Sequence, residues 1–94
     1  MDKVTYEYQV TTDHGEDIWY WGLDEFNKVI KDIKEYKNED GFYVELIKCK
    51  RIDDDIFGWG SDKDYFDVYP DNDNKDLPTY VQNNIAKVLE GVQQ

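Results

Sequence analysis

The sequence predicts an α+β fold in which an antiparallel sheet of about four strands packs against two helices, with the element order ββαββα. Two observations support this class. Four short segments alternate apolar and polar side chains or are rich in β-prone residues, and two longer segments have apolar residues every three or four positions, as helices do. The segments form two consecutive hairpin-plus-helix halves, and the order of the strands within the sheet stays open.

The first half begins with a predicted hairpin. Residues 4–11 alternate between apolar and polar side chains, residues 12–15 have the composition of a turn, and residues 18–21 are aromatic and β-prone. From Leu23 to Tyr36 the apolar residues follow a helical period, with acidic residues in the first turn and lysines near the end. This charge distribution suits the helix macrodipole, so we expect a helix here.

The second half repeats this pattern of elements but not the amino-acid sequence. Residues 42–52 predict the longest strand, and its apolar side chains on both faces are typical of a central strand. Residues 53–62 then predict a long acidic loop, and residues 65–69 predict a short strand that ends at Pro70. We therefore expect a second hairpin with a long connection.

The C-terminal segment predicts the second helix. Its apolar residues recur with the helical period at 77–90, Asp76 can cap the N-terminus, and Gly91 is expected to end the helix. These elements fit one domain comprising residues 1–94, because a chain of this length has room for a single small core.

The chain is strongly acidic. Its 22 acidic and 11 basic residues give a net charge of −11 over 94 residues. Direct binding of DNA or RNA depends on Lys and Arg that neutralise phosphates, so we expect no direct nucleic-acid binding. The sequence has no apolar run of about 18 residues and no N-terminal signal, so we expect no membrane association and a cytoplasmic location.

The residue types that support catalysis or metal binding are not arranged in a recognisable motif. Cys49 is the only cysteine, which argues against a disulfide framework and a paired-cysteine zinc site. The acids at 53–64 match a calcium-binding loop poorly, because Phe57 and Asp64 occupy ligand positions. The only histidine, His14, lies in a predicted turn. We therefore expect no enzymatic activity, no catalytic residues, no metal and no cofactor.

The most informative segment is residues 53–76, where nine acidic residues and two lysines are interleaved with large apolar and aromatic side chains. Disordered acidic segments have few aromatic residues, so this composition predicts a folded acidic surface with apolar anchors for a partner. Trp59 can be such an anchor or a loop residue that folds back onto the core. The predicted partner-binding residues are the carboxylates Asp53, Asp54, Asp55, Asp62, Asp64, Asp67, Asp71 and Asp73 and the anchors Phe57 and Trp59.

Physical chemistry suggests what such a surface binds. Duplex DNA presents one negative charge about every 1.7 Å along its axis, and a cleft rich in Lys and Arg that binds DNA also attracts a dense array of carboxylates. In size, acidity and aromatic content, the chain resembles the small phage-encoded DNA-mimic and anti-defence proteins, which include anti-CRISPR, anti-restriction and uracil-DNA glycosylase inhibitors. This resemblance is compositional. It implies an inhibitor that acts in the cytoplasm of the host bacterium on a basic nucleic-acid-binding protein, such as a nuclease or a CRISPR effector.

Three other functions agree with the sequence. An immunity protein or antitoxin would use an acidic face to neutralise a basic nuclease toxin, and the chain is similar in length and charge to barstar-like and colicin-immunity-like proteins. A carbohydrate-binding module would stack sugars on Trp19, Trp21 or Trp59 beside Asp and Asn side chains. A small structural interaction module would carry its acidic residues for solubility alone.

Overall fold

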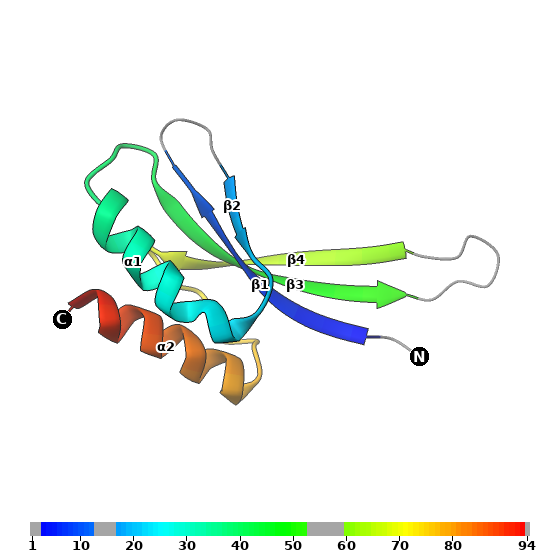
Figure 1. The fold of residues 1–94 in the computed structure, drawn as a ribbon. Coiled ribbons are helices and arrows are strands. Elements are labelled where there is room, and N and C mark those ends of the chain that lie inside the picture. The colour runs from blue at the N-terminus through cyan, green and yellow to red at the C-terminus, as the bar shows by residue number, and fades with distance from the viewer. Residues whose placement is uncertain (1–2, 13–16, 53–59, 94) are drawn as a thin grey trace.

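The computed structural model of the chain describes residues 3–12, 17–52 and 60–93. The predicted α+β class and the element order ββαββα are confirmed, and the helix expected from Leu23 is divided into a short 3-10 helix, η1, and the helix α1. The elements are β1 (Lys3–Thr11), β2 (Asp17–Tyr20), η1 (Leu23–Glu25), α1 (Phe26–Tyr36), β3 (Tyr43–Ile52), β4 (Gly60–Tyr69) and α2 (Thr79–Gln93) (Figure 1).

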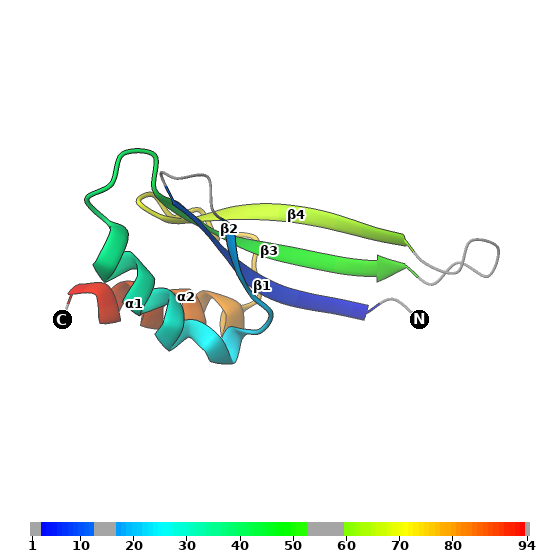
Figure 2. The same cartoon turned by 45° about the horizontal axis from the view of Figure 1, so that its top comes forward.

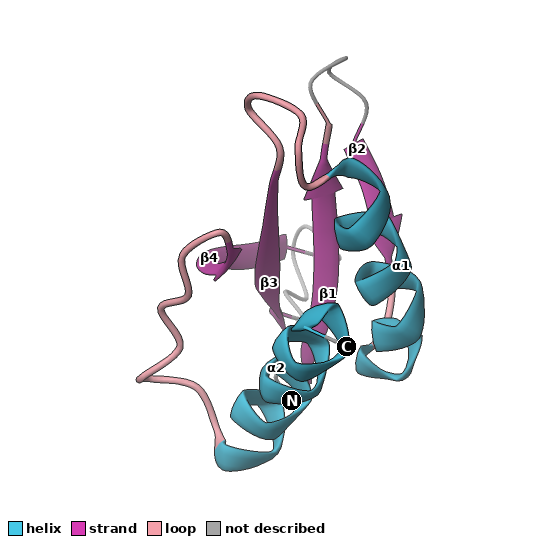
Figure 3. Ribbon diagram, turned by 90° about the vertical axis from the view of Figure 1, so that its left-hand side faces the viewer, coloured by secondary structure: helices cyan, strands magenta, loops and turns pink. Residues whose placement is uncertain are grey.

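The four strands form one antiparallel sheet in the order β2-β1-β3-β4, so β1 and β3 are central and β2 and β4 are the edges. The central position predicted for the longest strand is confirmed. β1 pairs with β3 along its whole length, and the register of β3 with β4 shifts at a bulge between Val44 and Glu45. Figure 3 shows how strongly the sheet twists between β1 and β4.

Both helices cover one face of the sheet, so the molecule has two layers (Figures 1 and 2). Alternation along each strand directs every second side chain towards the helices, and removing these side chains from water is the main source of stability. Among the fully buried side chains of this core are Tyr8 and Val10 of β1, Val44 and Leu46 of β3, Val68 of β4, Val29 and Ile33 of α1, and Val81, Ile85 and Val88 of α2.

The sheet extends beyond the helices. The N-terminal part of β1, the C-terminal part of β3 and the N-terminal part of β4 form an arm that the helices do not cover (Figure 1), and the molecule measures 47 × 30 × 20 Å along its principal axes. Val4 shows the effect of this geometry, because it lies on the same side of β1 as the buried Tyr6 and Tyr8 but is 42% exposed. The arm therefore depends on strand pairing more than on burial.

The structure corrects the predicted length of the last strand. The sequence predicts a strand at 65–69 that follows a long loop. The observed strand β4 spans Gly60–Tyr69 and is therefore twice as long as predicted. The prediction fails because residues 60–64 are rich in Gly, Asp and Lys, which are depleted in strands. The extension of β4 is therefore determined by its pairing partner and not by local composition.

Opposite charges across the strand pair explain why these polar residues form a strand. Asp62 of β4 lies opposite Lys50 of β3, and Asp64 lies opposite Lys48. Unlike charges in directly opposite positions stabilise a strand pair, whereas like charges destabilise it. The lysines of β3 thus favour the pairing of an acidic segment that would otherwise be a poor strand.

The second helix also differs from the prediction at both ends. α2 begins at Thr79, so Asp76 lies too far upstream to cap it. It continues through Gly91 to Gln93, and Gly91 has a different role from the one expected. A Cβ atom at this position would lie 2.4 Å from Cδ1 of Ile30 in α1. Gly91 therefore permits the close approach of the two helices and does not end α2.

Side-chain hydrogen bonds connect the sheet to the helices. The hydroxyl group of Tyr8 donates to Oδ1 of Asn84 in α2 at 2.5 Å, and Nδ2 of Asn84 donates to the carbonyl oxygen of Leu23 at 3.0 Å. At the edge of the sheet, the hydroxyl group of Tyr20 donates to Oδ2 of Asp32 in α1 at 2.5 Å. Burial raises the pKa of both tyrosines, and Asp32 adds to the shift at Tyr20, so both hydroxyl groups stay protonated donors.

We predict that Asn84→Ala lowers the free energy of unfolding by about 1–3 kcal/mol, because it leaves the buried hydroxyl group of Tyr8 without its acceptor. Asn83→Ala is the matched control, since residue 83 is exposed on the same helix and the change in helix propensity is the same. Urea unfolding followed by circular dichroism measures both variants. Equal unfolding midpoints would show that the Asn84 side chain does not stabilise the contact between sheet and helices.

Candidate functional site

The face of the sheet turned away from the helices is the candidate functional surface, and we call it the open face. No helix of the described chain packs on it (Figure 2). It combines aromatic, acidic and apolar side chains. Strand register and alternation place on it Thr5, Glu7, Gln9 and Thr11 of β1, Asp17 and Trp19 of β2, Tyr43, Glu45, Ile47 and Cys49 of β3, and Lys63, Tyr65 and Asp67 of β4.

Trp19 reaches across the open face. Its ring centroid lies 5.5 Å from Nζ of Lys63, although β2 and β4 are opposite edges of the sheet. Trp21 stacks against Trp19 with 6.2 Å between the ring centroids. On the two central strands between these edges, Ile47 is fully buried and Glu7 is only 8% exposed. The open face therefore carries a small apolar cluster that side chains cover without any helix.

The thiol of Cys49 lies beside this cluster. Burial and the nearby carboxylate of Glu7 raise its pKa, so the thiol is protonated at neutral pH and is a poor nucleophile. Among the residues that the structure describes, no group of three His, Cys, Asp or Glu side chains is placed to hold a metal ion. The polar chemistry of the open face is therefore that of carboxylates beside aromatic rings.

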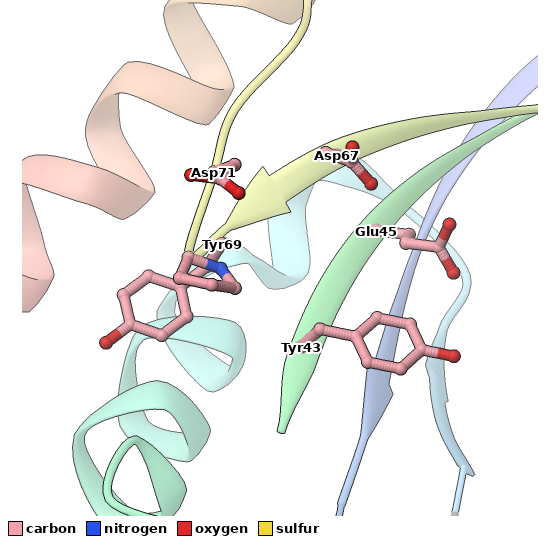
Figure 4. A pocket seen from close by; sticks show the side chains of 6 residues that line it. Tyr43, Glu45, Asp67, Tyr69 and Asp71 are labelled. Atoms are coloured by element: carbon pink, nitrogen blue, oxygen red, sulfur yellow. The ribbon is translucent and has the colours of Figure 1, made fainter. Parts of the chain in front are cut away.

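A pocket of about 250 Å³ lies where β3 begins and β4 ends (Figure 4). Tyr43 and Glu45 line it from β3, and Asp67 lines it from β4. Its described lining is completed by Tyr69 and by Pro70 and Asp71 just beyond β4. The pocket opens to solvent at the edge of the open face, and Tyr43 beside it is 41% exposed.

The strands pair unlike charges on the arm and like charges at this pocket. On the arm, Asp62 and Asp64 lie opposite lysines of β3, whereas Glu45 lies directly opposite Asp67. Burial, and then the charge of Asp67, raise the pKa of the Glu45 carboxyl group. No Lys, Arg or His is found among the described lining residues. The pocket is therefore a local excess of negative charge that the surrounding described side chains do not neutralise.

The predicted partner-binding residues do not share one surface in the described part of the chain. Asp62 and Asp64 are exposed on the helix side of the arm, Asp67 lies on the open face and Asp71 lines the pocket. The backbone amide of Asp73 donates to the carbonyl oxygen of Asp67 at 2.9 Å in the connection to α2. The structure thus brings Asp67 and Asp71 together and separates them from Asp62 and Asp64. The other predicted residues, Asp53, Asp54, Asp55, Phe57 and Trp59, lie outside the described residues.

Sequence reasoning missed three residues of this surface. Tyr43 and Glu45 belong to a strand that was predicted for its apolar side chains. Tyr65 belongs to the aromatic residues of the acidic segment, but the predicted anchors were Phe57 and Trp59. One signal was present, because Glu45 is an acidic residue within a strand that has apolar side chains on both faces. A carboxylate at such a position must either lie buried and paired or face solvent, so it marks the exposed side of the strand.

Comparisons of the chain with protein-family models, with curated proteins and with solved structures found no match. In the described part of the chain, neither helix has the length and apolar character needed to span a bilayer. The function is therefore argued from the open face and its pocket.

We predict that Glu45→Gln stabilises the fold at neutral pH by a few tenths of a kcal/mol, because it removes the repulsion between Glu45 and Asp67. The effect is small because solvent screens charges at the surface. A carboxyl group with a raised pKa in the folded state stabilises the fold while protonated, and that contribution is lost as the pH rises through this pKa. The gain in unfolding midpoint should therefore be present at pH 7 and disappear below the ordinary pKa of 4.5.

Asp64→Asn is the control for this measurement, because Asp64 lies opposite Lys48 and its charge is favourable. It should leave the stability at pH 7 unchanged or slightly lower. Thermal unfolding across a pH series compares the two variants with the unchanged chain. A gain from Glu45→Gln that is the same at pH 7 and at pH 3.5, about one unit below the ordinary pKa of 4.5, would contradict the repulsion.

Proposed function

We propose that this chain is an inhibitory binding protein whose acidic, aromatic-bearing surface mimics nucleic acid and occupies the basic cleft of a DNA- or RNA-handling enzyme. It acts by binding and not by catalysis. The observation that supports this proposal most directly is the uncompensated carboxylate cluster of Glu45, Asp67 and Asp71 on a face that no described element covers. The partner class is a basic nucleic-acid-binding protein, such as a nuclease or a CRISPR effector.

Charge complementarity supports the choice of partner. A net charge of −11 on 94 residues attracts basic surfaces over long distances and repels nucleic acid itself. Such a field raises the association rate with a cleft rich in Lys and Arg and suppresses binding to acidic or neutral proteins. The overall charge therefore selects the class of partner, and local contacts then determine the affinity.

Carboxylates on a rigid sheet are better suited to mimic nucleic acid than carboxylates on a flexible acidic tail. Directly opposite residues of neighbouring strands have Cα atoms about 4.5–5.5 Å apart, and every second residue along a strand is about 7 Å away. Carboxylates on β3 and β4 thus keep fixed spacings before any partner binds. A preorganised array of charges loses little conformational entropy on binding, which is the advantage that a folded competitor of DNA requires.

Exposed rings on the same face supply the apolar contacts that charge alone lacks. Tyr43 and Tyr65 are 41% and 53% exposed, and both lie beside carboxylates of the open face. Aromatic residues are enriched at the energetically important centres of protein interfaces. The combination of Tyr rings with Glu45 and Asp67 therefore fits a protein-binding surface better than a purely solubilising one.

We predict that the immobilised chain captures a basic nucleic-acid-handling protein from a bacterial lysate at low salt and releases it at high salt. Added duplex DNA should displace the captured protein, because both ligands occupy the same cleft. Mass spectrometry identifies the protein, and its nucleic-acid activity should fall as the chain is added up to one equivalent.

An unrelated folded protein of similar size and net charge is the control for this capture, because it reproduces the long-range field but not the surface. Capture that duplex DNA does not displace, or an activity that the chain leaves unchanged, would contradict the mimic. The same result with the control protein would show that net charge alone explains the binding.

A further inference from the structure

Between the row of Thr5 and the row of Thr11, the charged side chains of the sheet are distributed unequally between its two faces. On the helix side of the arm, two acids lie opposite two lysines, so the charges balance. On the open face, from the row of Thr5 to the row of Thr11, the acids outnumber the bases by four to one. They are Glu7, Asp17, Glu45 and Asp67, with Lys63 as the single basic side chain.

Lys63, the basic side chain of these rows, already contacts an aromatic ring. Nζ of Lys63 lies over the ring of Trp19, at the end of β4 remote from the pocket. Glu45 lies directly opposite Asp67 of β4 on one side and the uncharged Gln9 of β1 on the other, and Asp71 lines the same pocket. The described residues that line the pocket therefore include no cation that neutralises these carboxylates.

The pocket is large enough to hold a single side chain. Its volume of about 250 Å³ is smaller than the roughly 300–1,000 Å³ of pockets that bind drug-sized molecules. The pocket is open at the edge of the sheet, so a side chain projecting from another protein can enter it. Figure 4 shows Tyr43 and Glu45 projecting from β3, with Asp67 on β4 and Asp71 just beyond its end.

Arginine suits these walls better than lysine. A guanidinium group is planar, donates hydrogen bonds in a fixed fork to carboxylates, and stacks on aromatic rings, whereas an ammonium group is a compact and strongly hydrated point charge. Glu45 and Asp67 offer carboxylates on adjacent strands, and Tyr43 offers an exposed ring beside them. These are the groups that recognise both the charge and the plane of a guanidinium.

We infer that the open face docks an arginine-bearing segment of a basic partner, with one arginine side chain anchored in the pocket between Glu45 and Asp67. This inference rests on the proposed function, because the partner is the basic enzyme proposed there. The carboxylates accept hydrogen bonds from the guanidinium, and Tyr43 packs against it. Burial, and then the charge of Asp67, raise the pKa of Glu45, and a bound cation would offset the second of these effects.

The surrounding surface fits the periphery of such a contact. Ile47 is buried beside the pocket row, Tyr65 is 53% exposed next to it, and Trp19 lies across the neighbouring strands. A buried anchor surrounded by side chains that exclude water is the common arrangement of an interface hot spot. The binding surface inferred here is thus centred on the beginning of β3 and the end of β4, and not on the acidic run at 53–64.

The test uses the full chain labelled with ¹⁵N and two probes, hexa-arginine and hexa-lysine peptides, titrated in separate NMR experiments. Hexa-arginine should shift the backbone amide signals of residues 43–45, 67–69 and 71 most strongly, since Pro70 has no amide proton. It should bind about threefold or more tighter than hexa-lysine, because only the guanidinium can stack and form the fork. Shifts confined to residues 60–64, or equal affinity for the two peptides, would overturn the inference.

Two double variants separate local contacts from net charge. Glu45→Gln with Asp67→Asn, and Asp62→Asn with Asp64→Asn, each change two carboxylates of the β3–β4 pair and shift the net charge by the same amount. The first should weaken hexa-arginine binding about tenfold or more, and the second less than about threefold, which is the share expected from net charge. Equal losses in both variants would overturn the inference.

A second pair of variants applies if either double variant fails to fold. Tyr43→Ala should weaken hexa-arginine binding several-fold and reduce its advantage over hexa-lysine, because it removes the stacking ring. Tyr65→Ala is the control, since Tyr65 is also an exposed ring of the open face but does not line the pocket. Equal effects of the two substitutions on hexa-arginine binding would count against an anchored arginine.

The failure of this inference is distinguishable from the failure of the proposed function. If the lysate yields a DNA-displaceable target that the Glu45→Gln/Asp67→Asn variant captures equally well, the mimic stands and the arginine pocket is wrong. If hexa-arginine maps to the pocket but no nucleic-acid-handling protein is captured, the pocket stands and the proposed target class is wrong.

Discussion

The packing of two helices against one face of the sheet is the constraint on which the rest of the structure depends. Tyr8 and Val10 of β1 and Leu46 of β3 are fully buried at this contact. Because side chains alternate along a strand, burying one set of residues under the helices commits the other set to the opposite face. The open face is therefore a direct consequence of the core, and its chemistry is determined by the residues left between the buried positions.

The division of side chains between the two faces also determines what the acidic residues contact. Where the sheet extends past the helices, acids of β4 lie opposite lysines of β3, and their charges support the pairing of the arm. At the other end of the same two strands, Glu45 lies opposite Asp67, and the charges oppose each other. One strand pair therefore uses carboxylates in two ways, for its own pairing at one end and for a surface that attracts cations at the other.

The same distinction explains which features could be predicted from the sequence. Local periodicity predicts the strands, the helices and their order, because each element must bury one face. The extension of β4 and the order of the strands depend on pairing with other strands. The composition of a segment does not show which strand it pairs with. The candidate site was predicted from the composition of residues 53–76, which does not specify the face of each side chain. Alternation places Asp64 and Asp67 on opposite faces of the sheet, but this follows only if the strand begins early enough to include both residues. Glu45 was not predicted because its strand was expected to contribute to the core.

The repulsion between Glu45 and Asp67 links the stability of the free chain to its affinity for a cation. Both residues belong to paired strands, so their Cα atoms stay opposite each other and only side-chain rotation can separate the two carboxylates. A flexible acidic loop would relax its repulsion by moving its charges apart, and would then lose conformational entropy when a partner ordered them. In the sheet, the part of the repulsion that side-chain rotation does not relieve persists until an external cation neutralises the carboxylates, and the free energy released adds to the affinity. The position of two opposed carboxylates therefore matters more for affinity than the total number of acids, which mainly affects the rate of association.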